Sequence, residues 1–218
     1  MAKQVVMFDF DNTIVDSLSS WYEMMTKTMF KRYNSKPSKE LKDSFGVLSN
    51  KEQAELFIKL TNVNKTPQEI INEWNEIMKY NYLNNIKLIK GAKEFLYKLK
   101  SQGKKLILAS ATDEPLLKIV LKHFDIDIFD SIFTEGNLNL PKHDPIFFKC
   151  ILKKLNTSPD NVFFFEDSFA STKSATSIGI ECCSLIHEFN CKHKEEFKNI
   201  CNAVIKNYNN KFIKSLKL

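Results

Sequence analysis

Short apolar runs alternate with amphipathic segments over the second half of the chain, and one further apolar run lies at its start. The apolar runs have the length of strands and cover residues 4–10, 105–110, 131–134, 162–166 and 181–186. Helical periodicity marks segments at about residues 91–102, 114–123, 144–156, 168–178 and 192–216. Near-continuous apolar strands that alternate with helices are typical of a parallel sheet with helices on both faces. The pattern therefore predicts an α/β fold with a Rossmann-like, doubly wound core.

Residues 16–86 contain no comparable strand pattern, and their periodicity favours several helices. Asn50 is expected to cap one of these helices, with a Gln three residues on, and Thr66, followed by Pro and then Glu, is expected to cap another. The apolar face of this last helix consists of Ile70, Ile71, Trp74, Ile77 and Met78. We therefore expect two domains, a Rossmann-like core at residues 1–15 and 87–218 and a small α-helical insertion at residues 16–86.

Charge and cysteine patterns exclude several classes of protein. The net charge is +6, and its positive excess lies in two lysine-rich segments, 87–105 and 187–218, that also carry helical periodicity. Lysines on the wet face of a helix account for this excess. We expect no nucleic-acid partner, because Arg32 is the only arginine and the lysines are not interleaved with exposed aromatics. We expect no membrane span, because no apolar run is long enough to cross a membrane. We expect a cytoplasmic location, because the five cysteines lack C-x-x-C spacing and no charged leader precedes the first strand.

Two carboxylates, Asp9 and Asp11, follow the first apolar run directly. Alternate residues of an extended segment point to the same side, so both side chains are expected to face one site. Burying an unpaired carboxylate is costly. The sequence therefore predicts a cation or a chemical task at the end of the first strand.

Further polar residues end other strands of the predicted sheet. Ser110 ends the second strand, Glu166 and Asp167 end the fourth, and Lys142 lies just before the helix that leads into the fourth. Ligands of open α/β sheets bind outside the carboxyl ends of the strands, so these groups are expected to meet at one edge. Each also has a structural alternative by itself, since Ser110 could cap a helix and Lys142 could be a solvated lysine.

Four segments resemble the motifs of the haloacid dehalogenase superfamily of phosphohydrolases, in the order and spacing of that family. These segments are Asp9-Phe10-Asp11-Asn12-Thr13, Leu108-Ala109-Ser110-Ala111-Thr112, Lys142-His143-Asp144-Pro145-Ile146-Phe147-Phe148 and Phe165-Glu166-Asp167-Ser168. The resemblance spans residues 4 to about 186. Residues 16–86 stand where the branch with phosphoglycolate phosphatase and β-phosphoglucomutase has its small helical cap. Asn12 stands where the family usually has Gly, and Asn tolerates unusual backbone angles.

The resemblance implies chemical roles for residues of the first three motifs. Asp9 would be the nucleophile and would form an aspartyl-phosphate. Asp11 would protonate the leaving oxygen and then deprotonate the attacking water. The phosphoryl oxygens would be held by Ser110, Ala111 and Lys142.

The resemblance also implies a Mg²⁺ cofactor, an ion that prefers oxygen ligands. Asp9 and Asp167 would supply side-chain ligands, and Asp11 would supply its backbone carbonyl. Glu166 and Thr13 would support the site.

The implied activity is Mg²⁺-dependent hydrolysis of a small phosphorylated metabolite, such as a sugar phosphate, phosphoglycolate or a nucleotide. We expect the protein to be a monomer or a weak homodimer. Asp11 argues against the dehalogenases and phosphonate-cleaving enzymes of the superfamily, which lack this second acid. In the cap, Trp21 and Tyr22 could line the substrate pocket or serve plain packing. Two alternatives stay open: a β-phosphoglucomutase-like mutase, whose branch has a cap His where Trp21 stands, and a non-catalytic phosphate-binding regulatory protein.

Overall fold

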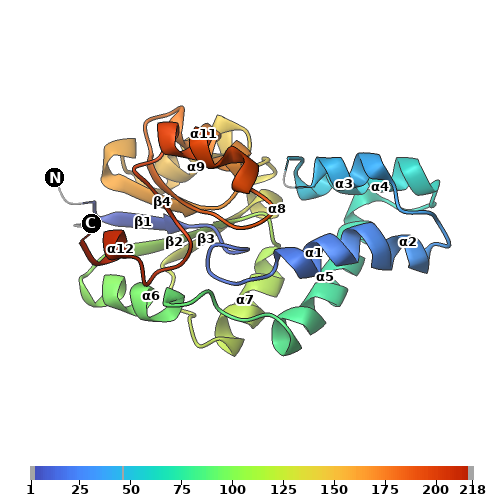
Figure 1. The fold of residues 1–218 in the computed structure, drawn as a ribbon, viewed down its shortest axis with the longest axis horizontal. Helices are drawn as coiled ribbons and strands as arrows, with labels where there is room; N and C mark the ends of the chain where they lie inside the picture. The colour runs from blue at the N-terminus through green and yellow to red at the C-terminus, as the bar shows by residue number, and fades with distance from the viewer. Residues whose placement is uncertain (1–2, 46, 216–218) are drawn as a thin grey trace. The chain divides into compact units, whose positions relative to one another are not determined.

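The structure is a computed structural model that describes residues 3–45 and 47–215. The chain forms two compact units (Figure 1). Met1–Asp16 and Leu88–Leu218 make up the core unit, and Ser17–Lys87 make up the helical unit. Within the described ranges, no helix has both the length and the apolar character needed to cross a membrane.

The core unit is built on a six-stranded sheet in which every pair of neighbouring strands is parallel. The strands are β1 (Val5–Phe8), β2 (Lys105–Ser110), β3 (Ser131–Thr134), β4 (Val162–Glu166), β5 (Glu181–Leu185) and β6 (Ala203–Ile205). Their order across the sheet is β3-β2-β1-β4-β5-β6, so the winding reverses direction beside β1. Ligands of doubly wound sheets bind at this switch point. The predicted α/β class, a Rossmann-like parallel sheet with a helical insertion, is confirmed.

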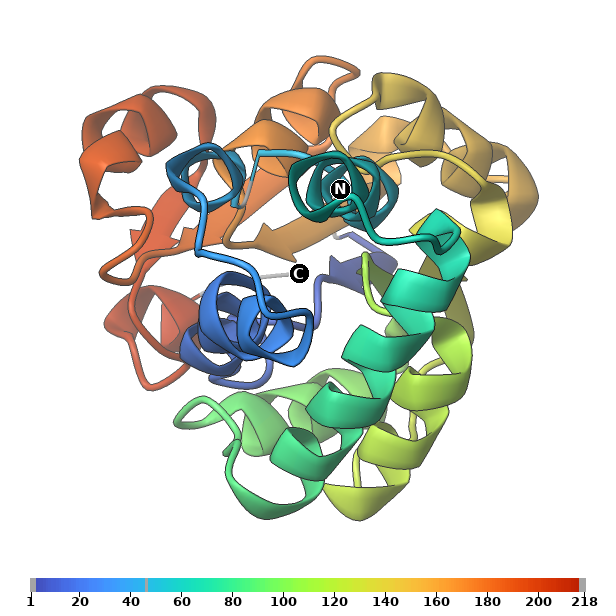
Figure 2. The same ribbon diagram turned by 90° about the vertical axis from the view of Figure 1, so that its right-hand side faces the viewer.

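Helices cover both faces of this sheet. The helical segments of the core unit are α6 (Ala92–Ser101), α7 (Glu114–His123), α8 (Glu135–Leu138), α9 (Pro145–Leu155), η2 (Pro159–Asn161), α10 (Phe169–Thr176), η3 (Cys191–His193), α11 (Lys194–Ile200) and α12 (Lys211–Ser215). Figures 1 and 2 show α6 and α7 on one side of the sheet and α9, α10 and α11 on the other. This division agrees with right-handed crossovers between parallel strands.

Alternate residues of the central strands fill two separate apolar layers. Phe8 and Phe165 are register partners whose rings stack with centroids 4.9 Å apart, and both rings contact Phe95 of α6. One position earlier, Phe164 belongs to the layer on the opposite face, where its ring lies 5.3 Å from that of Phe148 of α9. Because both faces are buried, the strands appear in the sequence as continuous apolar runs.

The C-terminal segment differs from the prediction. Residues 192–216 were expected to form one helix, whereas the structure has α11, then strand β6, then α12. β6 pairs in parallel with β5, with Ala203 opposite Cys183 and Ile205 opposite Leu185. An apolar run of three residues has no periodicity that separates a strand from a helix. Without β6, the backbone groups along this edge of β5 would lack hydrogen-bond partners in the sheet. Pairing with β5 therefore favours a strand over a helix for these three residues.

All the secondary-structure elements that the structure describes in the helical unit are helices, as predicted. They are α1 (Leu18–Glu23), the π-helical segment η1 (Met24–Thr28), α2 (Met29–Arg32), α3 (Lys39–Ser44), α4 (Asn50–Thr61) and α5 (Pro67–Asn84). The predicted capping box of α5 is confirmed, since the Thr66 hydroxyl accepts from the Glu69 N–H and the Glu69 carboxylate accepts from the Thr66 N–H. On the predicted apolar face of α5, Ile77 is half-buried and the other four residues are buried; Tyr82, which the prediction did not include, is also fully buried.

The predicted cap of α4 is wrong by one residue. Ser49 is the N-cap instead of Asn50, and its capping-box partner is Glu52. The Glu52 carboxylate accepts from both the N–H (2.8 Å) and the hydroxyl (2.6 Å) of Ser49. A carboxylate also interacts favourably with the positive end of the helix dipole, which a Gln at the third position would not.

Ionic hydrogen bonds around Glu73 join three segments of the helical unit. Its carboxylate accepts from Lys65 (2.5 Å), the Tyr33 hydroxyl (2.6 Å) and Arg32 (2.9 Å). Burial by itself raises the pKa of Glu73, but the hydrogen bonds from Lys65, Tyr33 and Arg32 outweigh burial and bring the pKa from 4.5 down to about 2. The folded state therefore binds fewer protons than the unfolded state, and this stabilisation is lost as the pH falls from about 4.5 to about 2.

Replacing Glu73 by Gln should remove this acid-sensitive stabilisation. At pH 7 we expect the free energy of unfolding to fall by about 1 kcal/mol, because the cluster is partly exposed to solvent. Near pH 2 the variant and the wild type should converge, since Glu73 itself becomes protonated. Urea unfolding at both pH values measures the two differences, with Glu76→Gln on the exposed face of α5 as the control. Equal losses at both pH values would contradict the ionic origin.

Candidate active site

The loop after β1 carries Asp9 and Asp11. The Asp9 N–H donates to the carbonyl of Phe165 on β4 (2.9 Å), which continues the sheet ladder past the last residue of β1. Asn12 has a φ of 54°, in the left-handed region that Asn tolerates better than most residues with a side chain. The chain can therefore turn sharply after Asp11 without glycine.

A tyrosine from the C-terminal segment braces this loop. The hydroxyl of buried Tyr208 donates to the carbonyl of Thr13 (2.9 Å), and its ring stacks on Phe95 at 5.2 Å. Burial raises the pKa of Tyr208 well above its usual value, so the hydroxyl remains a donor. Thr13 itself is fully buried. The sequence pattern carried no signal for Tyr208, which contacts a residue 195 positions away.

A buried ammonium lies between two of the candidate carboxylates. Lys142 Nζ lies 2.5 Å from Asp9 Oδ1 and 2.9 Å from Glu166 Oε2, and all three side chains are buried. The Lys142 N–H donates to Glu135 Oε1 (2.9 Å), which holds the loop before α9 in place. Burial by itself lowers the pKa of Lys142, but Asp9 and Glu166 raise it by more, so the ammonium stays charged.

Asp9, Glu166 and Asp167 form a carboxylate cluster that a single ammonium does not neutralise. One side-chain oxygen from each residue lies within 4.8 Å of the other two. Burial raises the pKa of Asp9 from 3.8 to about 8 and also raises the pKa of Glu166, although Lys142 lowers both. Glu166 Oε1 accepts from the N–H groups of Asp167 and Ser168 (each 2.9 Å), whereas Oε2 has the ion pair with Lys142 and, among the described residues, no hydrogen bond. Clustered oxygen donors with excess negative charge fit a hard divalent cation.

Thr112 connects the end of β2 to Asp11. Its hydroxyl donates to Asp11 Oδ2 (2.7 Å), and its N–H donates to Ser110 Oγ (3.0 Å). Ser110 is fully buried, and Ala111 lies between it and Thr112 in the same bend. Sequence reasoning did not single out Thr112, although a second hydroxyl two residues after Ser110 was a signal that could have found it.

The loop after β5 brings two more unpredicted residues to the site. His187 Nε2 lies 2.9 Å from Asp167 Oδ2, and Asn190 Nδ2 donates to the Asp167 carbonyl (2.8 Å). In the sequence, His187 has no spacing typical of metal ligands, which favours surface or core packing. Its place directly after a strand of a parallel sheet was the signal for a role at the same edge as Asp9.

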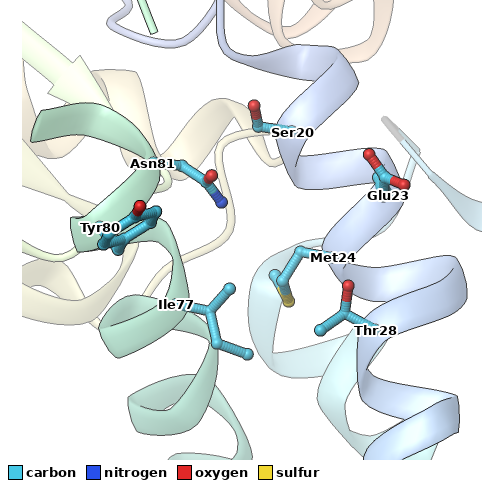
Figure 3. Close-up of a pocket in the computed structure, with 7 residues that line it drawn as sticks. All are labelled: Ser20, Glu23, Met24, Thr28, Ile77, Tyr80 and Asn81. Atoms are coloured by element: carbon cyan, nitrogen blue, oxygen red, sulfur yellow. The ribbon is translucent and has the colours of Figure 1, made fainter. Parts of the chain in front are cut away.

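Trp21 and Tyr22 lie in the helical unit. The buried indole of Trp21 donates to the Tyr82 hydroxyl (2.9 Å), and the ring of Tyr22 meets Phe45 edge-on at 5.4 Å. A pocket of about 400 Å³ lies between the α1–η1 segment and α5 of this unit (Figure 3). It is lined by Ser20, Glu23, Met24, Thr28, Ile77, Tyr80 and Asn81. A pocket role for Trp21 and Tyr22 stays a prediction.

The fold and the cluster together define an α/β enzyme with an acidic site at the switch point of its sheet. A family model described as haloacid dehalogenase-like hydrolase matches residues 6–185. The chain therefore belongs to the haloacid dehalogenase-like hydrolases, as the four motifs indicated.

Individual relatives resemble this chain over most of their length. A Thermotoga maritima protein named phosphorylated carbohydrates phosphatase is 25% identical over 194 residues, which cover 86% of this chain and 87% of the relative. The structure of CbbY from Rhodobacter sphaeroides in complex with phosphate has a TM-score of 0.80 at 17% identity, covering 94% and 95% of the two chains. A predicted phosphoglycolate phosphatase from Haemophilus somnus has a TM-score of 0.76 at 19% identity, covering 98% of each chain. At these identities the two structures show a shared fold.

Replacing Lys142 by Met should destabilise the fold, because the carboxylates of the cluster would lose the ammonium that lies between them. We expect the free energy of unfolding at pH 8 in EDTA to fall by about 3 kcal/mol, because a buried charge pair is broken. The loss should be smaller at pH 5, since Asp9, without its ammonium, keeps its proton to a pH above about 8 while the unfolded chain releases it near 3.8. Urea unfolding at both pH values measures the effect, with Lys153→Met on the exposed face of α9 as the control. A loss no larger than that of the control would contradict this account.

Proposed function

We propose that this hydrolase is a Mg²⁺-dependent phosphatase of small phosphorylated metabolites, with phosphorylated carbohydrates as the preferred class. The observation that carries the proposal is the buried Asp9 carboxylate beside Lys142, with Asp11 two residues further on at the same strand end. The substrate class is supported by the relative named phosphorylated carbohydrates phosphatase, which matches most of the chain.

Hydrolysis proceeds in two steps. A carboxylate oxygen of Asp9 attacks phosphorus, the bond from phosphorus to the leaving oxygen breaks, and that oxygen takes a proton from Asp11. A water molecule then attacks phosphorus in the aspartyl-phosphate and gives a proton to Asp11, which releases inorganic phosphate and restores the Asp9 carboxylate. The Thr112 hydroxyl, 2.7 Å from Asp11 Oδ2, orients the Asp11 carboxyl group, which donates a proton in the first step and accepts one in the second.

The remaining residues bind the phosphoryl group and its counterion. Lys142 and the turn at Ser110–Thr112 hold the phosphoryl oxygens, and the Lys142 ammonium offsets the negative charge beside Asp9. Asp9 and Asp167, with Glu166 beside them and the Asp11 carbonyl, would hold Mg²⁺, which when bound stabilises the charge of the phosphoryl group. The helical unit acts as the cap that selects the leaving group.

Replacing Asp9 by Asn should abolish turnover, because an amide neither attacks phosphorus nor carries the charge that a cation needs. We expect Mg²⁺-dependent phosphate release from p-nitrophenyl phosphate and from hexose phosphates to fall by at least about 10⁴-fold, with EDTA abolishing release by the wild type. Asp127→Asn, a change of the same type outside the cluster, should leave the rate unchanged.

The same assay separates the alternatives. Wild-type protein with no Mg²⁺-dependent turnover of any phosphate ester would contradict the hydrolase proposal and favour a phosphate-binding regulatory protein. Isomerisation of a hexose 1-phosphate with little phosphate released would favour a mutase.

Replacing Thr112 by Val should slow the proton-transfer step while leaving the nucleophile intact. Loss of one hydrogen bond to a carboxyl group corresponds to about a tenfold lower rate for the first turnover of a hexose phosphate. The first turnover of p-nitrophenyl phosphate should change less than about threefold, because that leaving group needs little protonation. Thr112→Ser keeps the hydroxyl and should restore both rates. Rapid-quench measurements test this, and equal slowing of both substrates would argue against it.

A further inference from the structure

The loop after β5 holds Asp167 at two points. His187 lies 2.9 Å from one oxygen of the Asp167 side chain, and Asn190 donates to the carbonyl of the same residue (2.8 Å). Both the carboxylate and the backbone of this acid are thus positioned by one short segment. The Asp167 side chain is only 13% exposed, so this contact is shielded from bulk water.

The hydrogen bonds around the imidazole assign its protons. The Phe189 N–H donates to His187 Nδ1 (3.2 Å), so this nitrogen carries a lone pair. A neutral ring then has its proton on Nε2, the nitrogen that faces Asp167 Oδ2. The loop therefore presents an N–H donor to this carboxylate oxygen.

Asn190 keeps the donor in place. Its Oδ1 accepts from the His187 N–H (2.9 Å), and its Nδ2 also donates to the Leu185 carbonyl at the end of β5 (3.0 Å). The loop begins at Ile186, whose N–H donates to Ile205 of β6 (2.7 Å). The imidazole is therefore anchored to the edge of the sheet, and it cannot follow a rotation of the Asp167 side chain.

We propose that His187 is a positioning residue that makes the metal site prefer Mg²⁺ over Ca²⁺. The proposal rests on the proposed function, in which Asp167 is a metal ligand. With Oδ2 held by the imidazole N–H, Asp167 offers one oxygen to the cation. Mg²⁺ requires near-octahedral geometry with single-oxygen ligands, whereas Ca²⁺ accepts more ligands and bidentate carboxylates. A freely rotating Asp167 would therefore penalise Mg²⁺ more than Ca²⁺.

Isothermal titration calorimetry of the metal-free full chain with MgCl₂ and with CaCl₂ tests this inference. His187→Phe should weaken Mg²⁺ binding about tenfold, the size expected for a partner that orients a ligand, and Ca²⁺ binding less than about threefold. His187→Gln restores an N–H donor and should bring the Mg²⁺ Kd back to within about threefold of the wild type. His193→Phe is the matched control, since His193 stacks on Phe169 and contacts Glu196.

Thermal unfolding in EDTA first shows that each variant is folded. An unchanged ratio of the Mg²⁺ and Ca²⁺ dissociation constants in folded His187→Phe would overturn the positioning role while leaving the proposed function intact. If His187→Phe and His187→Gln weakened the binding of both cations equally, the positioning role would also be overturned. The loss of affinity would then not depend on the N–H donor at position 187. Wild-type protein that binds no Mg²⁺ would overturn the proposed function as well.

Discussion

The excess of buried carboxylates over cations at the carboxyl end of β1 is the constraint on which the rest of the structure depends. Asp9 and Glu166 share the single ammonium of Lys142, and burial raises the pKa of both acids. Apolar side chains of similar volume would stabilise such a position at least as well. The arrangement fits the proposed cation site, because a bound divalent cation would balance the excess negative charge.

Asp9, Asp11 and Asp167 are each supported by a side chain from a different loop. Thr112 after β2 donates to Asp11, Lys142 before α9 pairs with Asp9, and His187 after β5 contacts Asp167. This separation allows neighbouring carboxylates to have different roles, because the orientation of each is set independently. The supports depend on the parallel sheet, since only strands that run in one direction bring these loops to one edge.

Much of the fold and the core of the site could be predicted, because both leave local patterns. Buried parallel strands are continuous apolar runs, and Asp9 or Glu166 stands out as a charge that directly follows such a run. The cap of α4 was misplaced by one residue because Ser49 and Asn50 are both good N-caps, and the contact with Glu52 decides between them. Strand β6 could not be predicted, because three apolar residues carry no period.

The amino-acid sequence by itself determined the class of fold, the helical insertion and the positions of the acids at the strand ends, since these follow from periodicity and from the direction of parallel strands. The tertiary structure alone decided which groups meet. Lys142 and Asp9 are 133 residues apart, and His187 and Asp167 are 20 apart. Such contacts form only when the loops close over an assembled sheet, so no local pattern records them. The physical reason is that loop geometry, set by hydrogen bonds such as those of Asn190, controls where each side chain points.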